Sequence, residues 1–528
     1  MMLREILRSC DSALRRREVT PFPDTDIAGI AYDSRKVGVG YLFIAIRGEK
    51  FNGIDFIRDV VQRGAAAIVY EQGDAGSGTP GTGPDSAVCF IRVANSRKAL
   101  ACIANNFYRR PSEHLTLIGI TGTNGKTTSS YILKSILETG GQDVGLIGTI
   151  QYIIKNRIFP AVHTTPESPE FQGLLHDMFL SGCAVVVSEV SSHALAQYRV
   201  DDAVFRTAVF TNLTRDHLDF HKTMEDYFRA KERLFTELLH RQGTAVINLD
   251  DPYGKRLYLL LKGGSNNTIT YSLEAETGAD MIASDIADTF EGLRFRLSFE
   301  GRQYGISSPL LGTPNVYNIL SAVGAAVSLR VPWEVILDGI NNAENIPGRF
   351  EKIGAGQEFL CIIDYAHTED ALERLITTAR ELISSPAAKK EHGKRRDIPV
   401  EKHRPARRVI TVFGCGGDRD HGKRPAMGAI ATRLSDFVII TSDNPRSEGL
   451  LDIIRDIEGG VVGENYLVEP DRREAIRKAV DMASPGDIVL VAGKGHETYQ
   501  EIKGIRHEFS DREVLKEIIR AKLTGRCA

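Results

Sequence analysis

The segment "GITGTNGKTTSS", residues 119–130, has the residue types needed to hold a phosphate group. Its glycines let backbone N–H groups turn toward phosphate oxygens, Lys126 can reach the terminal phosphates, and the hydroxyl of Thr127 can bind Mg²⁺. The strict pattern GxxxxGK[ST] requires glycine at position 120, where this chain has Ile120. The loop still lies between an apolar run and a helical pattern, so we predict a variant phosphate loop. The structural alternative is a Gly-rich loop with a chance lysine.

Other side chains that could do chemistry also follow apolar runs. Glu189 ends the run in "AVVVSEV" and could bind Mg²⁺ opposite the phosphate loop, or it could cap a helix or face solvent. His217 lies in the polar segment "TNLTRDHLDFH", where a metal or phosphate role competes with a structural one. By its chemistry alone, Lys231 is a solvated lysine on the following helix.

The elements that must position these residues alternate along the chain. Strands are predicted at 115–120, 184–190, 207–213, 244–250, 407–415, 436–442 and 487–493, with helical patterns between them. Short buried strands alternating with helices indicate α/β domains with parallel sheets. In such sheets ligands bind where the chain leaves the carboxyl ends of the strands.

Polar, proline-containing segments near residues 112 and 346 predict three domains, 1–112, 113–345 and 346–528. Two stretches are typical of surface loops. Residues 71–86 are rich in Gly, Ser and Pro, and residues 389–408 carry nine Lys or Arg. Nucleic-acid contact is the alternative for the basic stretch.

The composition excludes several classes of protein. The 528 residues carry a formal net charge of -3, which argues against a protein that coats nucleic acid. No apolar run approaches the roughly 18 residues of a membrane span, and no signal-peptide core is present. The 7 cysteines include no CxxC pair, so a reduced, cytoplasmic protein is expected.

Nine motifs in order together resemble the Mur ligase family of peptidoglycan synthesis. They are "TGTNGKTT", "TTPES", "EVSSHAL", "TNLTRDHLDFH", "YFRAKERLF", "GTPNVYNILSA", "PGRFE", "DYAHT" and "GKGHE". The resemblance implies a small N-terminal α/β domain that binds uridine, a central P-loop ATPase-type parallel sheet, and a C-terminal Rossmann-like α/β domain.

The resemblance also implies a reaction. ATP phosphorylates the D-glutamate γ-carboxylate of UDP-MurNAc-L-Ala-D-Glu, and the amine of an incoming amino acid attacks the resulting acyl phosphate. The implied cofactors are ATP and Mg²⁺, and the partners are small-molecule substrates of a monomeric enzyme. Domain closure would keep water from the acyl phosphate.

Matching positions imply roles for individual residues. The ATP site would use Gly122, Thr123, Asn124, Gly125, Lys126, Thr127, Thr128, Asn318, Arg349 and Asp364. Metal would be held by Thr127, Glu189 and His217, and by Lys231 if CO₂ converts it to a carbamate (N6-carboxylysine). Catalysis would rest on Lys126, Glu189, His217 and Lys231.

The UDP-linked substrate would contact the N-terminal and central domains. The implied residues are Ser34, Thr164, Thr165, Ser191, Gln197 and Arg199. One departure affects this site. The family segment "DGHDF" is "NGIDF" here, so that Asn52 replaces the acid and Ile54 the histidine.

The choice of amino acid is implied by three strand-end loops, "GGDRD", "SDNPRSE" and "AGKGHE". Their implied contacts are Arg419, Asp443, Asn444, Pro445, Arg446, Gly493 and Glu497. Arginines would take the distal carboxylate of diaminopimelate and Glu497 its ammonium. A buried arginine left without an anion would disfavour lysine by a few kcal/mol. The role of Glu448 is open: it could orient Arg446 or be solvated.

Other readings remain. A lysine-adding ligase of the same family is disfavoured by Arg446, and a folylpolyglutamate synthase by the presence of an N-terminal uridine domain. A non-catalytic nucleotide-binding protein on this scaffold would be expected to lose Lys126, Glu189 or Lys231, and all three are present.

Overall fold

The computed structural model describes residues 1–8, 10, 24–48, 51–71, 88–384 and 407–525. The chain divides into two compact units, Met1–Met281 with Leu320–Ile336, and Ile282–Ile319 with Leu337–Ala528. Most of the two expected surface loops, at 71–86 and 389–408, lies outside the described residues. The three domains, with boundaries near residues 112 and 346, stay a prediction.

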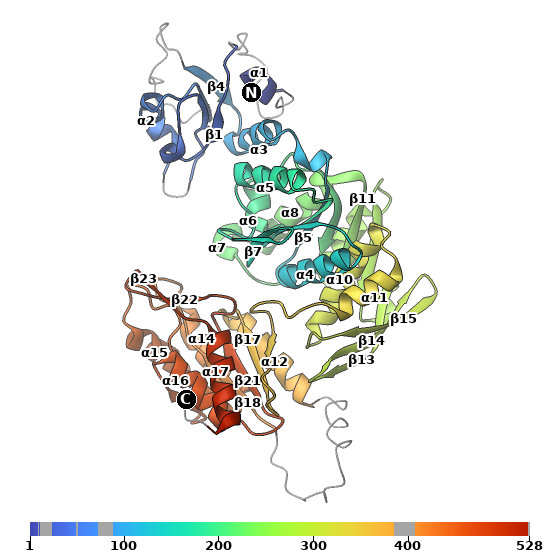
Figure 1. Cartoon of the computed structure of the whole chain (residues 1–528), viewed down its shortest axis with the longest axis vertical. Helices are drawn as coiled ribbons and strands as arrows, with labels where there is room; N and C mark the ends of the chain where they lie inside the picture. Colours follow the sequence, from blue (N-terminus) through green and yellow to red (C-terminus); the bar gives the residue numbers. More distant parts are fainter. Residues whose placement is uncertain (9, 11–23, 49–50, 72–87, 385–406, 526–528) are drawn as a thin grey trace, which may run out of the picture. The chain divides into compact units, whose positions relative to one another are not determined.

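A four-stranded parallel sheet opens the first unit, in the order β1-β2-β3-β4 (Figure 1). Its strands are β1 (Gly29–Ala31), β2 (Tyr41–Ile44), β3 (Ala67–Glu71) and β4 (Cys89–Val93). Leu42 and Ile44 pack with α1 (Leu3–Ile6) and α3 (Ser96–Phe107). Phe43 packs on the other face with α2 (Ile57–Gln62). This alternation of strand side chains gives the sheet two covered faces.

A disulfide joins Cys10 to Cys102 in this part of the chain. The prediction that the cysteines are reduced is therefore wrong for this pair. The two residues are 92 positions apart, and the packing of α1 against α3 brings their Cα atoms to 5.8 Å. The spacing of the cysteines along the sequence did not predict that Cys10 and Cys102 lie close together.

A larger sheet has β5 (Thr116–Thr121) near its centre. Within the first unit its order is β12-β11-β10-β5-β9-β6-β7-β8. Strands β12 to β6 run parallel, and β7 and β8 add an antiparallel edge. The bounds are β6 (Val144–Ile147), β7 (Gln151–Ile154), β8 (Arg157–Pro160), β9 (Val185–Glu189), β10 (Phe205–Phe210), β11 (Leu239–Asn248) and β12 (Asn267–Ser272). All of β9 is buried, as expected of a parallel strand covered on both faces.

Helices connect these strands. They are α4 (Lys126–Thr139), α5 (Ser168–Leu180), α6 (Ser192–Ala196), α7 (Leu218–His221), α8 (Met224–Arg233) and α9 (Pro252–Leu261). Helix α4 begins directly after the glycine loop, and α8 begins at Thr223, whose hydroxyl accepts a hydrogen bond from the N–H of Asp226. That cap fixes where α8 starts and therefore where Lys231 lies.

The second unit begins with strands β13 (Met281–Thr289), β14 (Gly292–Phe299) and β15 (Arg302–Ser308), of which β14 and β15 pair antiparallel. Helices α10 (Pro314–Ser328) and α11 (Trp333–Asn341) follow along the chain, and their residues Leu320–Ile336 belong to the first unit. Next comes a six-stranded sheet in the order β16-β17-β21-β18-β19-β20, parallel except for β16. Its strands are β16 (Glu351–Ile353), β17 (Leu360–Asp364), β18 (Val409–Phe413), β19 (Phe437–Ile440), β20 (Tyr466–Val468) and β21 (Ile488–Ala492).

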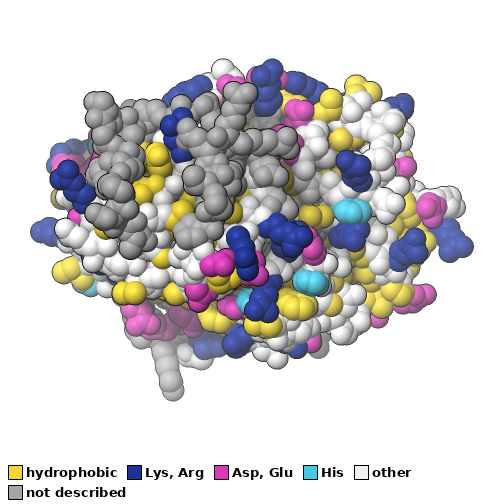
Figure 2. Space-filling view, turned by 90° about the horizontal axis from the view of Figure 1, so that it is seen from above, with side chains coloured by type: hydrophobic (Ala, Val, Ile, Leu, Met, Phe, Trp, Pro, Cys, Tyr) yellow, Lys and Arg dark blue, Asp and Glu magenta, His cyan; other side chains and the backbone are white. Residues whose placement is uncertain are grey.

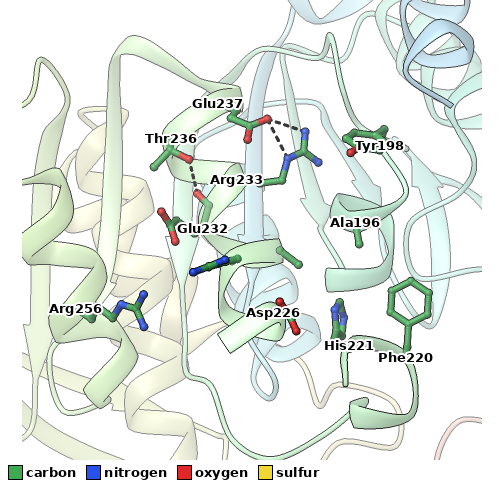
Figure 3. A pocket seen from close by; sticks show the side chains of 12 residues that line it. Ala196, Tyr198, Phe220, His221, Asp226, Glu232, Arg233, Thr236, Glu237 and Arg256 are labelled. Atoms are coloured by element: carbon green, nitrogen blue, oxygen red, sulfur yellow. Dashed lines mark hydrogen bonds and ion pairs between the residues drawn. The ribbon is translucent and has the colours of Figure 1, made fainter. Parts of the chain in front are cut away.

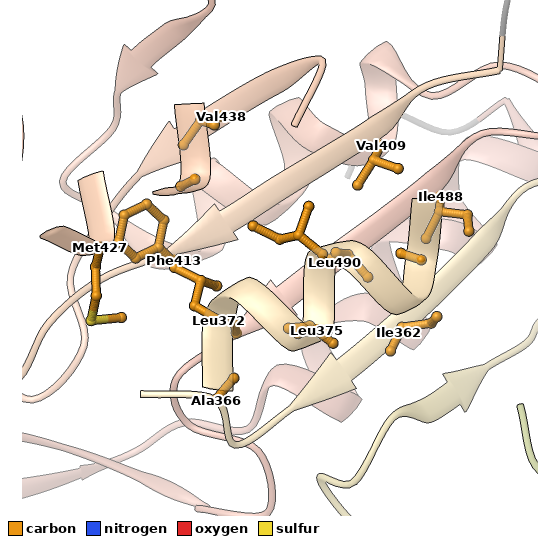
Figure 4. Close-up of a cluster of buried hydrophobic side chains, with 14 of the residues drawn as sticks. Ile362, Ala366, Leu372, Leu375, Val409, Phe413, Met427, Val438, Ile488 and Leu490 are labelled. Atoms are coloured by element: carbon orange, nitrogen blue, oxygen red, sulfur yellow. The ribbon is translucent and has the colours of Figure 1, made fainter. Parts of the chain in front are cut away.

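Helices cover both faces of this sheet. Leu372 and Leu375 of α12 pack on Phe413 and Leu490 on one face (Figure 4). Val412 and Val491 face a second cluster with α16 and α17. The remaining elements are α12 (Glu369–Ser384), α14 (Lys423–Leu434), α15 (Leu450–Glu458), α16 (Arg472–Met482), α17 (Asp511–Thr524) and the hairpin β22 (Tyr499–Ile502) and β23 (Ile505–Glu508).

The predicted α/β fold class is confirmed, and each of the seven predicted strands corresponds to an observed strand. The antiparallel additions β7–β8 and β14–β15 were not predicted. Within the described residues, no helix combines the length and apolar character needed to cross a membrane. On the face shown in Figure 2, Lys and Arg side chains lie among Asp and Glu side chains, in keeping with the nearly balanced net charge.

Candidate active site

The phosphate loop, residues 122–125, lies between β5 and α4 as predicted. Gly125 has φ of 87° and directly precedes α4, a conformation that favours glycine. The Nζ of Lys126 donates to the carbonyl oxygens of Gly122 and Thr123, both at 2.9 Å. The ammonium group therefore lies over the loop where a bound phosphate would need it.

Residues after β10 hold the loop in place. The N–H of Asn124 donates to Oδ1 of Asn212 at 2.9 Å, and the hydroxyl of Thr211 donates to the carbonyl oxygen of Asn124 at 2.6 Å. Thr123 contacts the Tyr227 hydroxyl at 3.1 Å. Thr211 and Asn212 were not predicted as site residues, although both lie at a strand end, which is the signal that could have indicated them.

Glu189 lies at the end of β9 and is fully buried. Its Oε2 accepts hydrogen bonds from the hydroxyls of Thr127 and Thr149, each at 2.9 Å, and its Oε1 accepts from the N–H of Thr149 at 3.0 Å. Burial with three donors excludes the solvated alternative. Thr149, which follows β6, was missed by the sequence analysis.

The donor set at this point fits Mg²⁺. A carboxylate and a hydroxyl oxygen lie together beside a phosphate loop, and Mg²⁺ commonly takes one or two protein oxygens together with substrate phosphates and water. Within the described residues, no group of three His, Cys, Asp or Glu side chains is placed to hold a metal ion by itself. Substrate oxygens would have to complete the coordination.

Lys231 is not the solvated lysine that its chemistry alone suggested. Its side chain is buried, and Nζ donates to the carbonyl oxygen of Gly122 at 2.9 Å. Burial lowers the pKa of Lys231 well below its ordinary value, and the nearby charge of Lys126 lowers it further. A neutral amine can attack CO₂, whereas an ammonium cannot, so this environment suits carbamate formation.

His217 precedes α7 in the left-handed region, with φ of 53°. Its side chain is half-exposed, and burial lowers its pKa while Asp216 opposes that shift. The rings of His193 and His217 lie 4.8 Å apart. A neutral imidazole at the surface of the loop region can act as a ligand or as a hydrogen-bond donor.

The residues expected to hold the muramyl dipeptide lie together beside Glu189. The hydroxyl of Thr165 donates to the carbonyl oxygen of Glu189 at 2.8 Å and accepts from the N–H of Ser191 at 3.0 Å. Thr164 contacts Thr149 at 3.0 Å.

Arg199 is already engaged within this group. Its guanidinium donates to Gln197 at 2.7 Å, to the carbonyl oxygen of Thr165 at 3.0 Å, and lies 3.0 Å from a carboxylate oxygen of Glu167. A substrate carboxylate would compete with Glu167 for this arginine.

In the N-terminal sheet region, Ser34 begins a short 3₁₀ helix, Ser34–Lys36, which is capped by Asp33. Asn52 and Ile54, which replace the acid and the histidine of the family segment, have structural roles here. Asn52 caps the next 3₁₀ helix, accepting from the N–H of Ile54 at 3.4 Å, and Ile54 packs against a buried apolar cluster. An apolar side chain there serves the core rather than a polar ligand.

In the second unit, three of the motifs lie in close contact. Gly348 and Gly495 have positive φ, and a Cβ on Gly348 would lie 2.4 Å from the backbone N of His496. The Asp364 carboxylate accepts from the N–H groups of Phe350 and Ala366, at 2.7 and 2.8 Å. "PGRFE", "DYAHT" and "GKGHE" thus form one loop cluster at the carboxyl ends of β17 and β21.

The predicted ATP contacts in the second unit stay predictions. Burial raises the pKa of Asp364, while the positive charge of Arg349 opposes that rise. The Arg349 guanidinium lies over the ring of Tyr365, 5.3 Å from its centroid. Asn318 on α10 donates to Asn315 at 2.8 Å.

The "SDNPRSEG" turn follows β19, and its side chains are held from several directions. Arg446 has φ of 50°, and its guanidinium donates to the carbonyl oxygen of Gly417 at 2.5 Å. Its Nε lies 3.9 Å from a carboxylate oxygen of Glu501. Nδ2 of Asn444 donates to Glu497 at 2.8 Å. The turn after β19 and the loop after β21 are therefore joined directly.

Glu448 is held within the protein rather than solvated, and its direct partners belong to the "GGDRD" loop and to α14. Its carboxylate accepts from the N–H of Asp418 and from the buried Arg424 guanidinium, the latter at 2.9 Å. Arg424 also pairs with Asp456 at 2.8 Å. This set of charges ties the "GGDRD" loop, on which Arg419 is exposed, to the "SDNPRSEG" turn.

A surface pocket of about 700 Å³ lies along another face of α8 (Figure 3). Tyr198, Phe220, Asp226 and Arg233 are among its lining residues. Arg233 pairs with Glu237 at 2.8 Å and with Asp201 at 2.9 Å. Arg233 is thus already neutralised, and the residues that line the pocket include none of the phosphate loop.

A phosphate loop on a mainly parallel sheet, with a buried acid at the next strand end, is the arrangement of nucleotide-dependent phosphoryl-transfer enzymes. Comparison with known proteins narrows that class. Three family models match: "Mur ligase family, catalytic domain" at 26–108, "Mur ligase middle domain" at 120–326, and "Mur ligase, glutamate ligase domain" at 399–495. The chain belongs to the Mur ligase family, which is ATP-dependent.

Two curated relatives are named UDP-N-acetylmuramoyl-L-alanyl-D-glutamate–2,6-diaminopimelate ligase. The one from Solibacter usitatus is 45% identical over 98% of both chains, and the one from Aquifex aeolicus is 42% identical over 93% of this chain and 94% of the relative. A solved structure of a ligase with the same name covers 99% of both chains at 32% identity, with a TM-score of 0.69.

Proposed function

We propose that this protein is the ATP-dependent ligase that joins meso-2,6-diaminopimelate to the D-Glu γ-carboxylate of UDP-MurNAc-L-Ala-D-Glu, in peptidoglycan precursor synthesis. Near-full-length similarity to relatives of that name supports the reaction. The observation that carries the choice of amino acid is Arg446 after Asn-Pro, in a turn bonded to Glu497 through Asn444.

In the first step, a carboxylate oxygen of D-glutamate attacks the γ-phosphorus of ATP and ADP leaves. Lys126 and the loop N–H groups hold the phosphates and offset the charge that gathers there. Thr127, Glu189 and His217 are the proposed Mg²⁺ ligands, and the ion would supply further neutralisation of the phosphates. Arg199, with Thr164, Thr165, Ser191 and Gln197, orients the dipeptide, and Ser34 meets the uridine.

In the second step, the free amine of the amino acid attacks the acyl carbon. The amine loses a proton, and the tetrahedral intermediate expels phosphate to leave the amide. Arg446, with Arg419, takes the distal carboxylate, and Glu497 takes the distal ammonium, with Asp443, Asn444, Pro445 and Gly493 shaping the site. Charge-assisted contacts of this kind distinguish a zwitterionic end from the simple ammonium of lysine.

Carbamylation of Lys231 is part of the proposal. Burial lowers the pKa of the Lys231 amine, and its neutral form can bond to the carbon of CO₂ and lose a proton, which leaves a carbamate anion. The product replaces a cation with an oxygen donor suited to Mg²⁺. A cytoplasmic location, where ATP is available, and a monomeric state belong to the same proposal, and light scattering would test the latter.

An ADP-release assay with UDP-MurNAc-L-Ala-D-Glu and a panel of amino acids tests the function. Turnover with meso-diaminopimelate and little with lysine is expected. Turnover with lysine alone would establish the lysine-adding alternative. No turnover with any amino acid would favour a non-catalytic nucleotide-binding protein.

A further inference from the structure

Lys494, in the "GKGHE" segment after β21, is fully buried, and its side chain is surrounded by acceptors from two loops. Nζ donates to Oδ1 of Asn444 at 3.0 Å and lies 3.3 Å from Oε2 of Glu497. It also lies 3.6 Å from Oδ1 of Asp443. With no exposed surface, Lys494 cannot touch a substrate in this arrangement.

Lys494 and the backbone of Glu501 together determine which way the Asn444 amide points. Oδ1 of Asn444 accepts from Nζ of Lys494 and from the backbone N–H of Glu501, at 3.0 and 2.9 Å. Both partners are donors, so the oxygen has to face them and the NH₂ group has to face Glu497, to which it donates at 2.8 Å. The Glu501 N–H shares the amide oxygen, but Lys494 is the donor that contacts both Asn444 and Glu497, and so it holds the two side chains together.

Asp443 and Glu497 share Lys494 as an ion-pair partner. Arg472 and Asp511 are both fully buried and form an ion pair at 2.8 Å. Lys494 then stands against two carboxylates, Asp443 and Glu497, of which Glu497 is the more exposed, at 18% against 8%. Glu497 is therefore the more accessible of the two carboxylates, and it is the one at which an ammonium group could be bound.

The surrounding backbone keeps this arrangement in register. Arg472 donates to the carbonyl oxygens of Ser442 and Ala492, at 3.1 and 3.0 Å, and so holds the ends of β19 and β21. Gln500 of β22 donates to the carbonyl oxygen of Asp443 at 2.8 Å. Lys494 is therefore the central cation of a fixed group rather than a loosely held side chain.

We propose that Lys494 is a positioning residue for the amino-acid substrate: it holds Asn444 and Glu497 so that Glu497 presents a carboxylate to the substrate ammonium. This inference rests on the proposed function of these loops. The inference adds Lys494 to the residues that serve the amino-acid site. Lys494 acts only through other side chains, and neither its residue type nor its place in the motif predicted this role.

Steady-state kinetics of Lys494→Met test the proposal. The KM for diaminopimelate should rise about 10- to 100-fold, the range expected for losing charge-assisted hydrogen bonds, while the KM values for ATP and the UDP-linked substrate change less than about twofold. Lys494→Arg, which keeps the cation, should restore part of the loss. The matched control is Lys522→Met, because Lys522 donates to three carbonyl oxygens near the end of α16.

A purely structural lysine would give a different result. If Lys494→Met leaves the KM for diaminopimelate unchanged, or raises all three KM values equally, the proposal is wrong. Should that variant fail to fold, Lys494→Gln replaces it, because its amide can still donate one hydrogen bond, and the same selective rise in KM is required. Turnover of diaminopimelate by the unmodified protein, measured first, tests the proposed function separately.

Discussion

At the scale of single residues, burial decides which polar side chains have fixed roles. Lys231, Glu189 and Lys494 lie on different elements, yet each is buried and each has named partners at about 3 Å. Burying a charge is costly unless it is paired or hydrogen-bonded. These residues are therefore the ones whose substitution should change chemistry or substrate binding most strongly.

Arg446→Ala should lower kcat/KM for diaminopimelate by about 100-fold, since a substrate carboxylate loses its charged partner. The KM for ATP should stay close to that of the unmodified protein. A matched control is Arg433→Ala, which removes an exposed arginine of α14 that pairs with Glu373. Near-normal kinetics of Arg446→Ala with diaminopimelate would overturn the assignment of the turn.

Lys231→Arg should reduce turnover at least about 100-fold, because a guanidinium cannot form a carbamate and leaves a cation where an anion is needed. In CO₂-depleted buffer the unmodified protein should lose activity and regain it when bicarbonate is added. The control Lys255→Met, an exposed lysine on α9, should behave normally in both buffers. Activity independent of both bicarbonate and Lys231 would contradict carbamylation.

At the scale of elements, strand ends position the loops that carry function. In the second unit the segments after β17, β18, β19 and β21 all leave the same edge of one parallel sheet. Arg472 holds two of these ends, and the apolar clusters on both faces keep the strands in register. The sheet thus fixes loops that the sequence separates by tens of residues.

Asp288 on β13 is a buried carboxyl group whose ionisation destabilises the folded state. Burial raises its pKa to about 6, so the folded state binds a proton more readily than the unfolded state. Below about pH 4 the carboxyl is protonated in both states, and its ionisation does not lower the free energy of unfolding. As the pH rises toward 6, the unfolded state ionises first, and the free energy of unfolding falls. Asp288→Asn should raise stability at pH 7 by up to about 3 kcal/mol, and by less at pH 5.

Thermal unfolding at both pH values would measure this gain. Asp285→Asn, on the same strand but 63% exposed, is the control and should show little pH-dependent gain. An equal effect of Asp288→Asn at pH 5 and pH 7 would show that ionisation of this carboxyl is not the cause.

At the scale of the whole molecule, long-range contacts add constraints that local sequence does not contain. The Cys10–Cys102 bond joins residues 92 positions apart, and the strands of the N-terminal sheet lie between them in the chain. Constraining a loop of that length in the unfolded chain stabilises the folded state by on the order of 4 kcal/mol. In a reducing cytoplasm this contribution would be absent.

Reduction with dithiothreitol should therefore lower the melting temperature of the oxidised protein, and Cys10→Ser should melt at the lower temperature with or without reductant. Mass spectrometry after thiol alkylation would report the bond directly. Cys89→Ser, at a free cysteine, should leave the shift intact. If the oxidised sample contains the bond and still melts at the same temperature as the reduced sample, the expected stabilisation is contradicted.

The sequence by itself determined the features that depend on neighbouring residues. Apolar runs predicted the parallel strands, and glycines before Lys126 and Thr127 predicted the phosphate loop, because strand patterning and loop conformation depend on neighbouring residues. Ordered motifs were enough to place the chain in its family.

Only the tertiary structure decided what depends on residues far apart in the chain. It placed Lys231 against the loop carbonyl 109 positions away, joined Cys10 to Cys102, and brought Lys494 to Asn444, 50 positions away. It also gave Glu448 its partners. The physical reason is that burial and charge pairing are properties of the packed fold, and no spacing along the sequence encodes which side chains it brings together.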